Sequence, residues 1–261
     1  MMNTEEVFNN RFKERLITKE LQIGLWSSLA SNIVTEILSY AGFDWILIDT
    51  EHAPNDISVL VSQLQAMKGS MTTPLVRPVW NDPVAFKRLL DIGFHNFIVP
   101  FVQNSEEAQN AVKAVRYPPQ GLRGVSVGAR GSCYGYTRDY WNRINDHIGL
   151  VVQVETLEAV GNIEAIFKVD GIDGIFVGPS DLAASMGHLA DSGHPDVQKK
   201  FAEIAELCQR IGAPVGILAG SAADSRTFID MGYNFVGVGS DTGILKKMSR
   251  ELAQSFKNKL A

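Results

Sequence analysis

The sequence predicts an α/β fold, a (β/α)8 TIM barrel in which eight parallel strands alternate with helices. Three observations predict it. Eight short runs recur along the 261 residues, and each is nearly continuous in apolar residues, as in parallel strands that are covered on both faces. The segments that follow them carry apolar residues at helical spacing. Eight such units in about 250 residues match the size of this barrel.

The expected strands follow one another along the chain, separated by segments long enough for a helix. Several follow a glycine or proline that would end the preceding helix, such as Gly42, Gly93 and Pro214. In chain order they span residues 22–28, 45–52, 73–79, 96–102, 150–155, 174–181, 214–220 and 235–241. A doubly wound open sheet is the main alternative. It would suit about five to seven strands better, and no glycine-rich dinucleotide loop follows any of these runs.

The interval 103–149, between the fourth and fifth expected strands, is about twice as long as a normal strand–helix unit. We expect a helix near 105–116 and a polar helix near 137–146, with a long loop between them. Such a loop in a compact domain is typically functional or part of an assembly. Residues 242–258 form an expected amphipathic helix. No linker interrupts the chain, so we expect one domain over residues 1–261.

Composition excludes several classes of function. The formal net charge of −5 gives no reason to expect nucleic acid or an anionic membrane as a partner. Cys133 and Cys208 are far apart and predict reduced thiols rather than a disulfide or metal framework. The charged N-terminal segment does not resemble a signal peptide, and no apolar run approaches the ~20 residues of a membrane span. We therefore expect a cytoplasmic protein.

Polar side chains gather where the expected strands end. The stretch LIDTEH runs from buried-strand residues directly into Asp49, Glu51 and His52. In a barrel of this kind the carboxyl ends of all strands share one rim, where active sites are built. The other strand ends contribute Trp26, Arg77, Gln103, Gln153, Glu155, Ser180, Asp181, Ser240 and Asp241. Acids, a base, an arginine and an amide therefore converge on one mouth.

Two of these carboxylates, Glu155 and Asp181, end consecutive strands and predict a metal site. Two facing carboxylates repel unless one is protonated or a cation lies between them. With neither cysteine nor histidine at the neighbouring strand ends, the cation would be a hard one, Mg²⁺ first, with Mn²⁺ or Co²⁺ as alternatives. A hydrogen-bonded carboxylate pair, or Asp181 capping the next helix, is the competing interpretation.

His52 has the chemistry of a general base, and Asp49 three positions earlier could hold its tautomer. Arg77 lies in an otherwise apolar strand, where a guanidinium needs an anionic partner: Asp49 or Glu51, or a substrate oxygen. His95 and His147 precede their strands and belong to the opposite rim. His188 and His194 lie in a loop, as surface or lid residues.

The lysines suggest a further restriction on chemistry. A Schiff-base aldolase needs a lysine on a strand, and the lysines of this chain fall in helices and outer loops. Metal-assisted chemistry remains. Two rival classes are a phosphate-binding barrel isomerase, which would use the glycines of GVGSD at 236–240 and no metal, and a non-catalytic sugar-acid sensor.

The motifs GFDWILIDTEHAPND, PLVRPVWNDP, RYPPQGLRGVS, VQVET and DGIFVGPSDLAASMGH together resemble the metal-dependent 2-oxo acid aldolases. The resemblance covers about residues 20–255. That family includes 4-hydroxy-2-oxoheptanedioate, 2-keto-3-deoxy-L-rhamnonate and 2-dehydro-3-deoxyglucarate aldolases, and several stretches, among them EHAPNDIS and KRLLDIGFHNFIVPFV, look closest to the last. It implies cleavage of 2-dehydro-3-deoxyglucarate to pyruvate and tartronate semialdehyde, with the other two activities as alternatives.

The resemblance also implies roles for residues. His52 becomes the general base, Arg77 the stabiliser of the transition state, Glu155 and Asp181 the metal ligands, and Gln153 and Ser180 with Asp181 the ligands of the pyruvyl group. It further implies a homohexamer with an exchanged C-terminal helix.

Two residues need separate treatment. The resemblance assigns Asp91 to raising the basicity of the histidine, although its helix position predicts the far end of its own barrel. A neighbouring subunit could receive it, and Asp49 is the local alternative. For the distal carboxylate of a diacid, charge and loop position favour Arg123, with Arg130 beside it, in its own or a neighbouring subunit.

Overall fold

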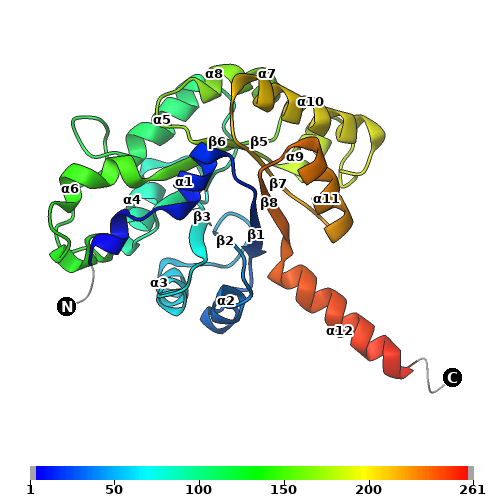
Figure 1. Ribbon diagram of the computed structural model, residues 1–261, viewed down its shortest axis with the longest axis horizontal. Coiled ribbons are helices and arrows are strands. Elements are labelled where there is room, and N and C mark those ends of the chain that lie inside the picture. Colours follow the sequence, from blue (N-terminus) through cyan, green and yellow to red (C-terminus); the bar gives the residue numbers. More distant parts are fainter. Residues whose placement is uncertain (1–3, 258–261) are drawn as a thin grey trace.

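Eight parallel strands close into one barrel in the computed structural model, which describes residues 4–257 (Figure 1). Each strand pairs with its neighbours in sequence, and β1 pairs with β8 to complete the closure. The prediction of a (β/α)8 barrel is therefore confirmed. Residues 1–3 of the N-terminal segment and residue 258 of the expected C-terminal helix lie outside the described residues.

The strands are short and almost entirely buried, as the continuous apolar runs predicted. Their bounds are β1 Gln22–Ser27, β2 Trp45–Asp49, β3 Thr73–Arg77, β4 Asn96–Val99, β5 Gly149–Val154, β6 Gly174–Val177, β7 Val215–Leu218 and β8 Phe235–Ser240. Every expected strand is present, and each observed strand ends one to four residues before the end of the expected run.

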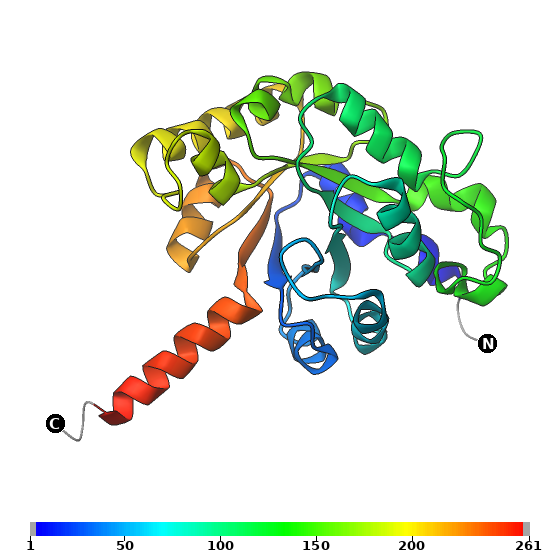
Figure 2. The same cartoon turned by 180° about the vertical axis from the view of Figure 1, so that it is seen from behind.

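Helices surround the barrel and return the chain from the carboxyl end of one strand to the start of the next (Figures 1 and 2). The α-helices are α1 Arg11–Thr18, α2 Asn32–Ser39, α3 Ile57–Ala66, α4 Pro83–Ile92, α5 Ser105–Val115, α6 Tyr140–Arg143, α7 Leu157–Gly161, α8 Ile163–Phe167, α9 Pro179–Ser185, α10 Pro195–Ile211, α11 Ala222–Met231 and α12 Asp241–Lys257. Three 3-10 helices complete the set: η1 Thr4–Phe8, η2 Arg130–Gly135 and η3 Ile144–His147.

The barrel interior is a packed core of large side chains, separate from the larger core between strands and helices. It includes Trp45, Phe176 and Phe235, together with Phe12 and Leu16 from α1. Helix α1 therefore closes the amino-terminal end of the barrel, with the Phe12 ring edge-on to Trp45 and Phe235. Gly24 is required here, because a Cβ at that position would lie 2.0 Å from the Trp45 ring.

The long segment between β4 and β5 covers the outside of the barrel near α4. Helix α5 matches the expected helix near 105–116, whereas the expected polar helix near 137–146 is divided into α6 and η3. Arg130 donates to the carbonyl of Ile92 at the end of α4 (2.7 Å), so the segment packs beside the amino-terminal rim.

Helix α12 projects away from the barrel (Figures 1 and 2). Among its described residues only Asp241 is buried. Its carboxylate accepts from the backbone N–H groups of Ser28 and Leu29, both at 3.0 Å, which fixes the start of the helix to β1. Apolar side chains are exposed along the rest of it, among them Ile244, Met248, Leu252 and Phe256.

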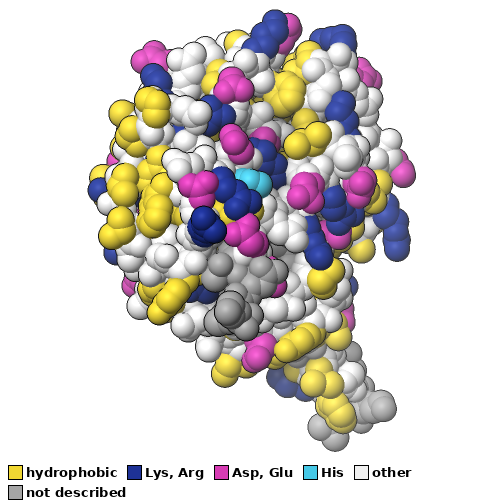
Figure 3. Space-filling model, turned by 60° about the vertical axis from the view of Figure 1, so that its left-hand side comes forward, with side chains coloured by type: hydrophobic (Ala, Val, Ile, Leu, Met, Phe, Trp, Pro, Cys, Tyr) yellow, Lys and Arg dark blue, Asp and Glu magenta, His cyan; other side chains and the backbone are white. Residues whose placement is uncertain are grey.

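The outer surface carries mixed charge, as Figure 3 shows for one face, where acidic and basic side chains are interspersed. No helix within residues 4–257 combines the length and the apolar character needed to cross a membrane. Cys133 and Cys208 are both free thiols, as predicted.

Candidate active site

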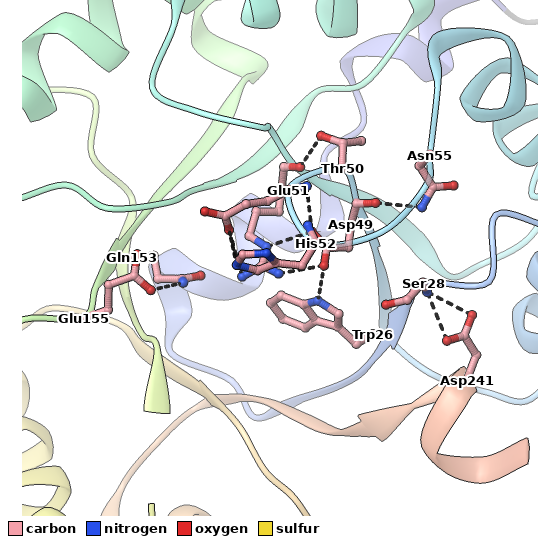
Figure 4. Close-up of polar contacts among 11 residues, drawn as sticks. Trp26, Ser28, Asp49, Thr50, Glu51, His52, Asn55, Gln153, Glu155 and Asp241 are labelled. Carbon is pink, nitrogen blue, oxygen red and sulfur yellow. Dashed lines mark hydrogen bonds and ion pairs between the residues drawn. The ribbon is translucent and has the colours of Figure 1, made fainter. Parts of the chain in front are cut away.

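A polar layer lies on top of the apolar core inside the barrel. Side chains alternate along a strand, so residues two apart share a face. Asp49 follows Leu47 on the interior face of β2, Arg77 follows Leu75 on β3, and Gln153 follows Val151 on β5. The carboxyl ends of the strands therefore direct these polar groups into the shared mouth; Figure 4 shows Asp49 and Gln153 there.

Asp49 and Arg77 form the central ion pair of this layer. They are register partners on adjacent strands, and the carboxylate binds the guanidinium through two bonds, Nε–Oδ1 at 2.9 Å and Nη2–Oδ2 at 2.6 Å. Burial opposes ionisation of Asp49, but the hydrogen bonds and charge of Arg77 outweigh it and hold the pKa of Asp49 below its ordinary value. The guanidinium carbon of Arg77 lies over the Trp26 ring, 5.1 Å from the centroid of that ring.

Glu51 links this pair to His52. Its Oε2 lies 3.1 Å from Arg77 Nη1 and 3.9 Å from His52 Nε2. Burial raises the pKa of Glu51, and the carboxylates of Asp49 and Asp181 raise it further against the opposing charges of Arg77 and His52. The His52 side chain is 67% exposed and therefore stands at the open mouth.

The structure does not bring the Asp49 carboxylate to the His52 imidazole. Both oxygens of Asp49 are bound to Arg77, and Oδ1 also accepts from the backbone N–H groups of Glu51 at 3.0 Å and His52 at 3.5 Å. Asp49 therefore shapes the loop and orients Arg77. The carboxylate nearest the imidazole is that of Glu51.

Glu155 is held by two donors at the end of β5. Its Oε1 accepts from the backbone N–H of Phe101 at 2.8 Å, and its Oε2 accepts from the side-chain amide of Gln153. Gly178 leaves room for the carboxylate, since a Cβ there would lie 2.4 Å from Oε2. Burial, followed by the charges of Asp181 and Glu51, raises the pKa of Glu155 to about 7.

Ser180 and Asp181 lie in the exposed first turn of α9. The N-cap of this helix is Gly178, with no side-chain cap bond, so the structure does not support the alternative that Asp181 caps it. Within residues 4–257 the Asp181 carboxylate has no hydrogen bond to the backbone. Its charge acts on both Glu51 and Glu155, which places three carboxylates around one region of the mouth.

These residues fit a divalent cation. A carboxylate whose pKa is raised by burial, and further by other acids that face it, is stabilised in its ionised form by a cation placed among them. The buried Oε1 of Gln153 has no hydrogen-bond partner within the described residues, which leaves one more oxygen available to a ligand. Oxygen donors of this kind suit a hard cation.

Asp91 and Arg123 lie elsewhere. The Arg123 side chain is 1% exposed. Its guanidinium carbon lies 4.3 Å from the Tyr117 ring centroid, and its Nη2 is 3.6 Å from the Asp91 carboxylate near the end of α4. The structure does not bring Arg123 into the mouth of its own barrel, because its side chain is enclosed between the Tyr117 and Tyr140 rings. Its role toward a distal carboxylate in a neighbouring subunit stays a prediction. Asp91 is likewise far from His52 along the axis of its own barrel, as its helix position predicted.

The remaining histidines occupy the predicted regions. His95 and His147 precede β4 and β5 at the amino-terminal rim, and burial, with the charge of Arg123, lowers the pKa of His95 to about 3. The rings of His188 and His194 stack with their centroids 3.6 Å apart, in the surface loop before α10. Both half-buried side chains lie beside the Asp196 carboxylate. None of the eight strands carries a lysine, in agreement with the sequence.

Two contributors were not identified from the sequence. Gly178 could not be recognised as a site residue from the sequence, because a glycine at a strand end is common. Phe101 could not be recognised either, because it contributes a backbone N–H whose direction depends on a positive φ of 54°.

The fold and the mouth define a (β/α)8 barrel whose rim gathers carboxylate and amide oxygens that fit a divalent cation, beside an arginine and an exposed histidine. Residues 22–247 match the model of the HpcH/HpaI aldolase/citrate lyase family. A 5-keto-4-deoxy-D-glucarate aldolase from Enterobacter sp. (strain 638) is 52% identical over 254 residues, which cover 97% of this chain and 99% of that protein.

Solved structures agree with the match. A HpcH/HpaI aldolase/citrate lyase family protein from Burkholderia cenocepacia J2315 is 38% identical, with a TM-score of 0.92, and the alignment covers 95% of this chain and 100% of that chain. A citrate synthase is 27% identical with a TM-score of 0.84, covering 97% and 100%.

The chain belongs to the HpcH/HpaI aldolase/citrate lyase family. It is an aldolase, a carbon–carbon lyase, of a family that depends on a divalent metal ion.

Proposed function

We propose that the chain catalyses reversible retro-aldol cleavage of 5-keto-4-deoxy-D-glucarate, also called 2-dehydro-3-deoxyglucarate, to pyruvate and tartronate semialdehyde. The observation that carries the proposal is the 52% identity, over nearly the full length of both chains, to an aldolase named for this substrate. The alternatives are cleavage of 4-hydroxy-2-oxoheptanedioate or of 2-keto-3-deoxy-L-rhamnonate, which also release pyruvate.

Glu155 and Asp181 are the proposed metal ligands, and Mg²⁺ is the proposed ion. When bound, such an ion acts as a Lewis acid that stabilises negative charge on the 2-oxo oxygen. The convergence of Glu51, Glu155 and Asp181, with the raised pKa of Glu155, supports this assignment. Gln153 and Ser180 with Asp181 are the proposed ligands of the pyruvyl group, beside the same ion.

Arg77 is the proposed stabiliser of the transition state. The two bonds from Asp49 fix its guanidinium, while only Glu51 engages Nη1, so N–H donors remain for an oxyanion in the mouth. A positive charge held in place before the reaction needs no reorganisation as the oxyanion develops.

His52 is the proposed general base for the C4 hydroxyl group. Its exposed imidazole stands at the mouth, where it can take the hydroxyl proton directly or through one water as the C3–C4 bond breaks. In the synthetic direction the same group returns the proton.

We further propose that the chain acts as a single domain in a homo-oligomer, a hexamer, in which α12 packs on a neighbouring barrel. Its exposed Ile244, Met248, Leu252 and Phe256 recur at helical spacing. Helix α2 and the residue that follows it carry a second exposed apolar stripe, Ile33, Ile37 and Tyr40. In such an assembly Asp91, 28% exposed at its side chain, is the proposed partner of a neighbouring subunit's histidine.

The substrate proposal is tested by measuring pyruvate release with Mg²⁺ present from 5-keto-4-deoxy-D-glucarate, 4-hydroxy-2-oxoheptanedioate and 2-keto-3-deoxy-L-rhamnonate. We expect kcat/KM for the first to exceed the others by about tenfold or more, since polar recognition of the distal group adds to shared pyruvyl binding. A higher kcat/KM for either alternative would replace the substrate assignment and leave the family unchanged. The cytoplasmic location expected from the sequence stays a prediction.

A further inference from the structure

The turn after β4 adopts an unusual backbone conformation directly beside the metal-ligand candidate Glu155. Pro100 follows the strand, and Phe101 then has a φ of 54°. In this conformation its N–H points at Glu155 Oε1, 2.8 Å away, and the next N–H, of Val102, donates to the carbonyl of Gln153 at 3.2 Å. Two consecutive backbone N–H groups of this turn therefore donate hydrogen bonds to residues at the end of β5.

A positive φ is disfavoured for a residue with a bulky side chain, so surrounding contacts must impose it. The Phe101 ring stacks on the ring of Trp80, with centroids 5.5 Å apart and planes at 29°. Val102, directly after it, is fully buried. Phe101 and Trp80 are themselves 39% and 51% exposed, so burial of apolar area explains the stack poorly. Backbone strain of this kind concentrates at functional sites.

We propose that Phe101 is a positioning residue: its left-handed backbone conformation, braced by Trp80, fixes the carboxylate of Glu155 for metal binding. This inference rests on the proposed role of Glu155 as a ligand.

The geometry of the carboxylate supports the inference. Phe101 occupies one lone-pair site on Oε1, and Gln153 occupies one on Oε2. An ionised carboxylate has about four such sites, so each oxygen keeps one for a cation. A hydrogen bond to the charged form also favours the ionised state that a metal requires. Gly178 leaves the space beside Oε2 free of a side chain, so the carboxylate can lie between its two donors without a clash.

The test measures the Kd of Mn²⁺ by calorimetry for the full-length, metal-stripped protein. Phe101→Val keeps the N–H but places a β-branched residue where φ is positive, and we expect its Kd to rise about tenfold. Phe101→Gly keeps the N–H and accepts the positive φ, so we expect binding within about threefold of the original chain. Trp80→Ala should weaken binding about threefold, whereas Trp80→Phe, which keeps a ring for the stack, should restore it.

The glycine variant separates positioning from general stability, because it loses the aromatic ring yet should retain metal affinity. Tyr136→Ala, which removes an aromatic side chain that is 80% exposed, serves as the matched control and should leave Kd unchanged. If the valine variant does not fold, Phe101→Ala replaces it, and the same order is expected, with glycine binding more tightly than alanine.

Unchanged affinity in Phe101→Val, or equal losses in the valine and glycine variants, would overturn the inference while leaving the metal site intact. Absence of Mn²⁺ binding by the unaltered chain, or undiminished binding by Glu155→Gln, would overturn the proposed metal site and this inference with it.

Discussion

Four polar residues share the barrel mouth because each occupies an inward position two or four residues beyond an apolar core residue. They are Asp49, Arg77, Gln153 and Glu155. The alternation of side chains along each strand therefore brings these residues together in the mouth. The pairing register then decides the contacts, since Asp49 and Arg77 are register partners.

Replacement of Asp49 should cost both stability and activity. Asp49→Asn removes the charge that compensates the buried Arg77, and we expect the free energy of unfolding to fall by about 3 kcal/mol. Activity should fall as well, because Arg77 loses the partner that orients it. Urea unfolding and pyruvate release measure the two effects. Asp56→Asn, at an exposed N-cap without a side-chain bond, should change stability by less than about 0.5 kcal/mol. Equal stability of the two variants would contradict the structural role of the pair.

The raised pKa of Glu155 predicts how the stability of the metal-stripped protein depends on pH. Between the ordinary value of 4.5 and about 7, the folded chain retains a proton at Glu155 that the unfolded chain has released. Its contribution to stability is therefore complete below 4.5 and is lost as the pH rises to about 7, by at most about 3 kcal/mol.

The difference in unfolding free energy between the unaltered chain and Glu155→Gln, measured at about pH 5 and about pH 8, should shift in favour of the variant at the higher pH. Glu158→Gln, an exposed glutamate three residues along, should show no such shift. A difference that does not change with pH would mean that Glu155 titrates normally.

At the residue scale the sequence identified the rim but not all of its contacts. Arg77 and Glu155 could be predicted, because a charged residue at the end of an apolar strand is informative without coordinates. The contacts of Asp49 could not be predicted, because a separation of three residues along the chain does not determine which donor each carboxylate oxygen faces. The Phe101 N–H depends on a backbone angle that no side-chain pattern encodes.

The strands show how far element boundaries follow from sequence. Each apolar run identified a strand, but the runs extended past the observed ends: the expected strand 45–52 ends at Asp49, and the expected strand 174–181 ends at Val177. The reason is physical. The first residues of a βα loop can stay buried beyond the last strand residue, as Thr50 and Ala219 do, so the strand end is difficult to place from the sequence. Site residues on these loops, such as His52 and Asp181, are therefore assigned to strands too readily.

Helix α1 illustrates an element whose function the sequence did not reveal. Its buried Phe12 and Leu16 belong to the barrel interior rather than to the outer core. Phe12→Ala would open a cavity below Trp45, and we expect a loss of about 3–5 kcal/mol in the free energy of unfolding. Ile17→Ala on the same helix removes a side chain that is 69% exposed and should cost less than about 0.5 kcal/mol. Chemical denaturation of both variants tests whether α1 is part of the barrel core. If the helix were only loosely attached, the two variants would lose similar amounts of unfolding free energy.

At the scale of the whole molecule, α12 leaves an apolar stripe exposed that a single chain does not cover. Two substitutions on this stripe, Leu252→Asp and Phe256→Asp, should shift the protein toward smaller species in sedimentation velocity, because they place charge in the proposed contact. Lys247→Asp, on the polar face of the same helix, controls for the added charge. An oligomer that persists unchanged in both stripe variants would assign the contact to another surface.

The closed barrel itself was predictable, because eight βα units leave few compact arrangements of parallel strands. The positions of Asp91 and Arg123 were harder. Both lie near the amino-terminal rim of their own barrel, and only an assembly could bring Asp91 to a mouth. A sequence read as one chain cannot distinguish residues that serve their own site from residues that serve a neighbour.

The most direct test of the proposed chemistry is pyruvate release from 5-keto-4-deoxy-D-glucarate by metal-stripped protein, with and without added Mg²⁺, compared with Glu155→Gln. We expect release only when Mg²⁺ is added to the unaltered chain, and a loss of at least about a hundredfold in the variant. Equal release without metal, or full activity in Glu155→Gln, would contradict a mechanism in which this carboxylate holds the catalytic ion.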